Sequence, residues 1–137
     1  MNKTKLYIDI DGVLLTNKKT TASEYACEFL NYCVKNFDCY WLTTHCKGDN
    51  KNVLKYLNEY FNVEMNDTFN LIKSTYWETL KTEAIDFTSN FIWLEDNPFN
   101  AEIEILQKNN VIHNLIVINL NNKDELKRVK NIIQKKI

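Results

Sequence analysis

Near its beginning the chain reads LYIDIDG (residues 6–12), and this segment is typical of the first strand of an α/β domain. Its first residues are apolar enough for a central strand, which Gly12 then ends. Asp9 and Asp11 lie two residues apart at the carboxyl end, so their side chains point the same way. Because close carboxylates repel and buried charge is costly, a cation or a shared proton is expected beside them.

Downstream, apolar runs of strand length alternate with segments of helical periodicity. Further strands are expected at residues 39–43, 91–94 and 115–118, with residues 69–72 as a candidate for a short one. Helices are expected at residues 20–37, from 49 or 50 to 61, 82–87, 98–108 and 123–136. This alternation predicts a single α/β domain over residues 1–137. It would be a Rossmann-like three-layer sandwich, with a central parallel sheet of about five strands and helices on both faces.

The composition is typical of a globular domain. Of the 137 residues, 45% are hydrophobic and 26% are charged, and the net charge is −1. No apolar run approaches a membrane span and no signal peptide is evident, so a soluble cytoplasmic protein without a membrane partner is expected. A net charge of −1 provides no overall positive field that would attract nucleic acid, so nucleic acid could bind only through a local basic surface. The four cysteines show no metal-ligand spacing.

Ligands of parallel sheets bind beyond the carboxyl ends of the strands, and polar residues stand at several of these ends. Thr43 and Thr44 end the second strand, where a hydroxyl and backbone amides could hold a phosphoryl oxygen. Glu95 and Asp96 form a second acidic pair after residues 91–94, where capping of the next helix is the alternative role. Carboxylates beside phosphate oxygens suit Mg²⁺, which is the expected cofactor.

A lysine near this edge would neutralise both a phosphate and an attacking carboxylate. Lys81 precedes the expected helix at residues 82–87, and Lys73 is the rival candidate. Acids, hydroxyls and a base are therefore predicted to gather at one edge of the sheet.

The order of these motifs resembles the haloacid dehalogenase (HAD) superfamily along essentially the whole chain. DIDGVL (residues 9–14) is similar to its first and most specific motif, DxDGVL, and WLT (residues 41–43) is similar to the second. Lys81 stands where the third motif has its lysine, and Glu95-Asp96 resembles the acidic fourth motif. The surrounding phrases are similar to small bacterial HAD domains, including those associated with RNA-repair proteins.

The resemblance implies a phosphatase, a hydrolase of phosphoric monoesters. Asp9 would attack phosphorus and form an aspartyl-phosphate. Asp11 would protonate the leaving oxygen and then activate water. Dehalogenases of this superfamily lack an acid at the position of Asp11, so its presence favours phosphoryl transfer.

The same resemblance implies the ligands of the site. Mg²⁺ would be held by Asp9, the backbone carbonyl of Asp11, and Asp96. Glu95 stands where many relatives have Asp, and its longer side chain could shift the metal contact, so Asp96 is the preferred ligand. Asp96-Asn97 also resembles the Asp-Asn pair of the protein-phosphatase branch, which leaves Glu95 and Asn97 as alternatives to Asp96. The phosphoryl group would be bound by Thr43, the Thr44 amide and Lys81.

The segments that could carry a cap domain are short. Residues 12–20 and 62–80 leave no room for a large cap, which implies an open site. An open site suits a phosphorylated substrate of either small or macromolecular size. His45 and Lys47 are expected at its rim.

A non-catalytic module is the alternative. A receiver-like phosphoacceptor, or a degenerate HAD domain that binds a partner, would show a similar acidic pocket. In a receiver the acidic pair normally precedes a separate phosphoacceptor strand, whereas here the second pair comes late in the chain.

Overall fold

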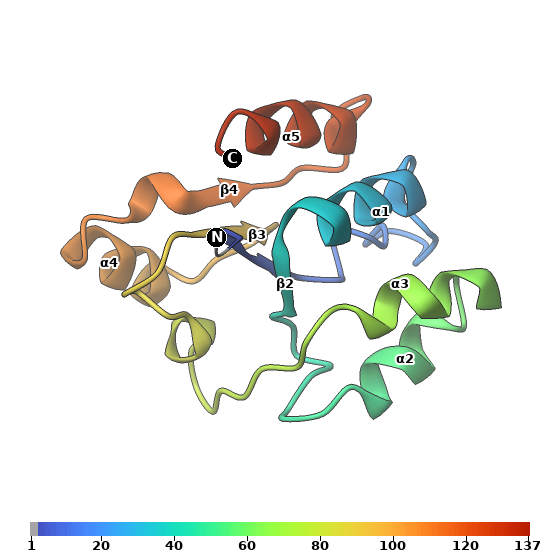
Figure 1. Cartoon of the computed structure of the whole chain (residues 1–137), viewed down its shortest axis with the longest axis horizontal. Coiled ribbons are helices and arrows are strands. Elements are labelled where there is room, and N and C mark those ends of the chain that lie inside the picture. The colour runs from blue at the N-terminus through green and yellow to red at the C-terminus, as the bar shows by residue number, and fades with distance from the viewer. Residues whose placement is uncertain (1–2) are drawn as a thin grey trace.

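Four parallel strands form one sheet at the centre of the computed structural model, which describes residues 3–137 (Figure 1). The strands are β1 (Lys5–Ile8), β2 (Asp38–Trp41), β3 (Phe91–Glu95) and β4 (Leu115–Val117). Their order across the sheet is β2-β1-β3-β4, and each neighbouring pair is parallel. Acidic residues stand at the carboxyl ends of the two central strands, because Asp9 directly follows β1 and Glu95 is the last residue of β3.

Across residues 3–137, five α-helices and three short 3-10 helices surround the sheet. The α-helices are α1 (Ala26–Asn36), α2 (Lys51–Leu57), α3 (Asn66–Asn70), α4 (Asn100–Lys108) and α5 (Glu125–Gln134). The 3-10 helices are η1 (Val63–Met65), η2 (Lys81–Ala84) and η3 (Ile112–Asn114). Within residues 3–137, none of the helices is both long and apolar enough to cross a bilayer.

Each face of the sheet has its own hydrophobic core, because successive strand residues point to opposite faces. Leu6 and Ile8 of β1 belong to the larger core, to which α1, α2, α3 and α5 contribute. Tyr7 belongs to the smaller core, together with Ile85 after η2 and Leu106 of α4. Figure 1 shows α1 and α5 near each other and α4 well apart from both. Helices therefore cover both faces, as the sequence predicts for a buried parallel sheet.

The prediction of about five strands was wrong, because residues 69–72 do not form one. Phe69 lies in α3, and Lys73 makes only an isolated parallel bridge to Tyr40 of β2. Phe69 and Ile72 are fully buried, whereas Leu71 between them is 63% exposed. Side chains three residues apart lie on the same face of a helical turn, which explains why both Phe69 and Ile72 are buried. A segment of four mostly apolar residues is too short to distinguish this helical period from a strand.

Helix α1 begins six residues later than the periodicity predicts. The residues before it form a loop that folds back on the turn after β1. The Ser23 hydroxyl donates to the Val13 carbonyl over 3.0 Å, and the Ser23 N–H donates to the Leu14 carbonyl over 2.7 Å. Leu15 makes isolated bridges to Asp11 and Ala22. This loop brings the residues that follow Gly12 across the carboxyl ends of β1 and β3.

Candidate functional site

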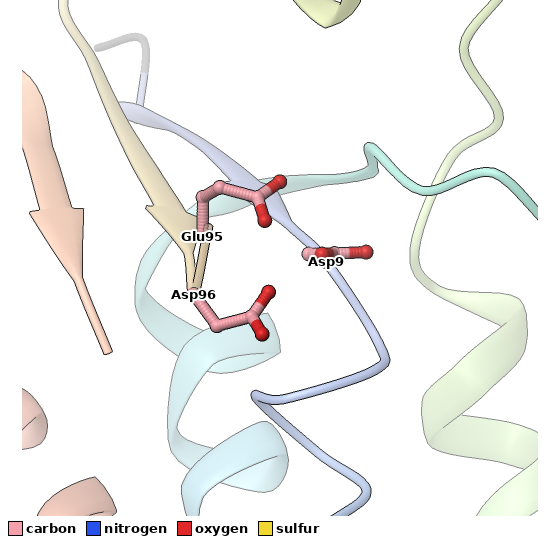
Figure 2. A group of neighbouring side chains, drawn as sticks. All are labelled: Asp9, Glu95 and Asp96. Atoms are coloured by element: carbon pink, nitrogen blue, oxygen red, sulfur yellow. The ribbon is translucent and has the colours of Figure 1, made fainter. Parts of the chain in front are cut away.

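Three carboxylates meet at the carboxyl ends of the two central strands. Ile8 of β1 pairs with Leu94 of β3, so Asp9 and Glu95 follow at the same level of the sheet. One oxygen from each of Asp9, Glu95 and Asp96 lies within 4.8 Å of the others. Figure 2 shows the Glu95 and Asp96 carboxylates on the side of β3 that faces Asp9. These side chains lie together because β1 and β3 are neighbouring strands and end at the same level.

Lys81 places its ammonium group among these acids. Its Nζ lies 2.6 Å from Oε1 of Glu95 and 3.2 Å from Oδ2 of Asp9. The first turn of η2 is held by the buried Glu102, whose Oε2 accepts the Lys81 N–H over 2.8 Å. Glu102 also accepts the Phe99 N–H at the start of α4. The lysine thus comes from a turn that is fixed to a neighbouring helix.

Burial controls the protonation of the cluster. Asp9 is 5% exposed, and this burial raises its pKa against the lowering effect of Lys81. Burial also raises the pKa of Glu95, and the charge of Asp9 adds to that effect. The pKa of Asp96 is raised by burial and by the neighbouring Glu95 carboxyl. Burial by itself acts to lower the pKa of Lys81, but the charges of Asp9 and Glu95 outweigh it and the pKa is raised.

Gly12 lies against Asp96 in a way that no other residue could. Its φ is +80°, and a Cβ atom built on it would lie 2.1 Å from Oδ2 of Asp96. Asn17, from the loop after Gly12, donates its side-chain N–H to the same Oδ2 over 3.1 Å. The backbone N–H of Ile10 donates to Oδ1 of Asp9 over 2.8 Å. The turn after β1 therefore holds both the first and the last acid of the cluster.

The Asp11 carboxylate points to different partners. Its Oδ1 accepts the Tyr56 hydroxyl over 2.6 Å, and its Oδ2 lies 2.9 Å from Nε2 of His45. The rings of His45 and Tyr56 stack with centroids 3.9 Å apart. Burial, with the hydrogen bond to Asp11, raises the pKa of Tyr56, so its hydroxyl keeps its proton. The Asp11 side chain is thus not part of the group formed by Asp9, Glu95 and Asp96.

The other predicted residues lie at varying distances from this cluster. Thr43 and Thr44 follow β2 beside β1; Thr43 is fully buried and Thr44 is exposed. In the described part of the chain, no hydrogen bond joins either threonine to the acidic group. Lys73 pairs with Asp38 at the other end of β2 over 2.9 Å and is largely exposed. Of the two candidate lysines, the structure therefore brings Lys81 to the acids.

A cleft of about 540 Å³ opens beside Asp96. Its walls come from the turn and loop after β1 and from the segment after β4, including Asn17, Lys18, Asn119 and Asn121. His45 and Lys47 follow β2 at a different place, where Lys47 donates to the Trp77 carbonyl over 2.8 Å. Their prediction as rim residues stays a prediction.

Sequence reasoning missed Asn17, Tyr56 and Glu102. Glu102 stands three residues after Phe99 at the start of a predicted helix, a spacing at which a Glu side chain can cap the helix, so it had a detectable signal. Asn17 and Tyr56 had none, because their partners lie 79 and 45 residues away along the chain.

Comparisons with models of protein families, with curated proteins and with solved structures found no match for this chain. The function of the site is therefore inferred from its own groups and distances.

Proposed function

We propose that this chain is a Mg²⁺-dependent phosphohydrolase of the HAD type, with a Rossmann-like sandwich fold, that hydrolyses a phosphate monoester through an aspartyl-phosphate on Asp9. One observation carries the proposal. Asp9, Glu95 and Asp96 converge with Lys81 at the edge of a parallel sheet where ligands of such sheets bind. The resemblance of residues 9–14 to the first HAD motif agrees with it.

The charges and donor atoms of the cluster fit Mg²⁺. Three ionised carboxylates beside one ammonium leave two negative charges uncompensated, which a divalent cation would balance. All three candidate side-chain donors are oxygens, the ligands that Mg²⁺ prefers. Asp9 and Asp96, with the backbone carbonyl of Asp11, would hold the ion, which would neutralise charge on the phosphoryl oxygens.

In the first step Asp9 attacks phosphorus in line with the leaving oxygen. The bond from phosphorus to Asp9 forms, the bond to the leaving oxygen breaks, and Asp11 transfers a proton to that oxygen. Lys81, 3.2 Å from Oδ2 of Asp9, favours the ionised form of this nucleophile at neutral pH. The first product is the alcohol or phenol of the substrate.

In the second step water attacks the same phosphorus. Asp11, now ionised, accepts a proton from the water while the bond between phosphorus and Asp9 breaks. Inorganic phosphate leaves, and Asp9 and Asp11 return to their starting states. Thr43, the Thr44 amide and Lys81 would bind the phosphoryl oxygens, and charge neutralisation would supply most of the acceleration.

The short segments around the site suit an open active site. The Asp11 side chain is 42% exposed, and the cleft beside Asp96 is lined by exposed loops. Substrates of small or macromolecular size would both have access to it.

The test is hydrolysis of p-nitrophenyl phosphate with Mg²⁺ and with EDTA. We expect activity only with Mg²⁺, and a loss of at least about a thousandfold in kcat for Asp9→Asn. Asp38→Asn is the matched control, because Asp38 stands at the opposite end of β2 and pairs with Lys73. Asp9→Asn protein that keeps wild-type activity would remove Asp9 as the nucleophile.

The receiver-like alternative predicts a different result. Acetyl phosphate would phosphorylate Asp9, and the phosphorylated chain would persist for hours without turning over esters. A half-life of seconds, followed by release of phosphate, is expected of the phosphatase.

A further inference from the structure

The carboxylate of Asp11 is held by two side chains from different parts of the fold. Tyr56 comes from α2, and its hydroxyl donates to Oδ1 over 2.6 Å. His45 follows the end of β2, and its Nε2 lies 2.9 Å from Oδ2. Each carboxylate oxygen therefore has its own partner, although the Asp11 side chain is 42% exposed.

The two partners also support each other. The rings of His45 and Tyr56 are stacked with an interplanar angle of 18°, and Tyr60 packs edge-on against Tyr56 with centroids 5.5 Å apart. The buried Val53 and Leu57 anchor the helix that carries Tyr56. Without such partners the carboxyl group of an aspartate rotates within a broad energy well.

The chemistry of the two contacts differs. A tyrosine hydroxyl that donates to Oδ1 uses this oxygen as an acceptor, which favours Oδ2 as the site of a proton carried by Asp11. The imidazole of His45 can donate to Oδ2 or accept from it, depending on its tautomer. Oδ2 is thus the oxygen that can gain and lose a proton.

We infer that Tyr56 and His45 are positioning residues that hold Asp11 with Oδ2 as its proton-exchanging oxygen, and that they set the ability of the enzyme to cleave esters with poor leaving groups. The inference rests on the proposed function. An alkoxide needs the proton of Asp11 as its bond to phosphorus breaks, whereas p-nitrophenolate leaves without one. Misplacing Oδ2 should therefore slow the first kind of substrate selectively.

The experiment compares kcat/KM for a primary alkyl phosphate and for p-nitrophenyl phosphate at saturating Mg²⁺. This constant reports formation of the aspartyl-phosphate, the step in which Asp11 acts as an acid. For Tyr56→Phe and His45→Leu we expect losses of about 10- to 100-fold with the alkyl ester and less than about threefold with the aryl ester. His45→Gln keeps an amide group near the position of Nε2 and should recover most of the alkyl rate.

Tyr60→Phe is the matched control, because Tyr60 packs against Tyr56 but makes no hydrogen bond to Asp11 within residues 3–137. It should leave both rates unchanged. Urea unfolding of each variant checks that the protein is folded, and Tyr56→Phe and His45→Gln alter few atoms.

Equal losses on both substrates would mean that the pair is merely structural and would overturn the inference, as would variants that lose nothing. Activity that survives in Asp9→Asn would instead refute the proposed function. A wild-type protein that turns over neither ester would refute both.

Discussion

Replacement of Gly12 by alanine tests whether the missing side chain at this position is needed to leave space for the Asp96 carboxylate. The new Cβ would lie 2.1 Å from Oδ2 and 2.3 Å from Cγ of Asp96. Non-bonded heavy atoms do not approach below about 3 Å, so the Asp96 carboxylate must move by roughly 1 Å. The distance from a ligand oxygen to its metal ion has to stay within about 0.2 Å of its ideal value. The displaced Asp96 carboxylate could therefore no longer bind Mg²⁺ together with Asp9.

Gly48→Ala provides the matched control. Its φ is +91°, close to that of Gly12, but an added Cβ would meet only Cδ1 of Tyr76 at an ordinary 3.8 Å. Both substitutions should cost about 1–2 kcal/mol from the left-handed backbone conformation. Only Gly12→Ala should also weaken Mg²⁺ binding, by at least about 10- to 100-fold.

Urea unfolding with and without Mg²⁺ measures both effects. At a Mg²⁺ concentration 100 times the wild-type Kd, bound metal raises the free energy of unfolding by about 2.7 kcal/mol. After a 100-fold loss of affinity the same concentration should add only about 0.4 kcal/mol. If Mg²⁺ stabilises Gly12→Ala as much as it stabilises Gly48→Ala, the close approach of Gly12 to Asp96 has no bearing on metal binding and the reasoning fails.

Two further predictions concern the charges of the cluster. Lys81→Ala should lower kcat by at least about 100-fold, because it removes the ammonium group beside Asp9. Lys73→Ala should leave kcat unchanged, because Lys73 pairs with Asp38 at the other end of β2. If steady-state assays show the loss for Lys73→Ala and not for Lys81→Ala, the phosphate-binding role belongs to Lys73. The pKa values of Asp9 and Glu95 are raised in the folded state, so the unfolded chain releases these protons first as the pH rises. In EDTA the contribution of these two groups to stability should be fully present below about pH 4 and should be lost as the pH rises through the raised values. Asp9→Asn should flatten that fall in urea unfolding measured from pH 4 to 8, and superimposable curves for the two proteins would contradict the assignment.

Much of the fold could be read from the chain because its signals are local. Residues 6–8 and 91–94 are apolar runs that are directly followed by Asp9 and Glu95, and parallel strands gather their carboxyl ends at one edge. Asp9 and Glu95 were therefore predictable neighbours. The alternation of strands and helices likewise predicted a parallel sheet with a core on each face. Residues 69–72 misled, because a short apolar run has the same appearance in a strand and in a buried helical turn.

Periodicity reports which face of an element is apolar, but it does not report which distant element that face will meet. Whether Lys81 or Lys73 reaches the acids depends on how η2 is fixed to α4, and the sequence left both possible. The partners of Asp11 depend on how α2 docks near the end of β2, which no local pattern specifies. Gly12 indicated a turn in the sequence, but its close contact with Asp96 arises because β1 and β3 lie side by side, with residues such as Ile8 and Leu94 paired although they are 86 positions apart. Side-chain partners of this kind are set by docking and register, and these exist only once the chain has folded.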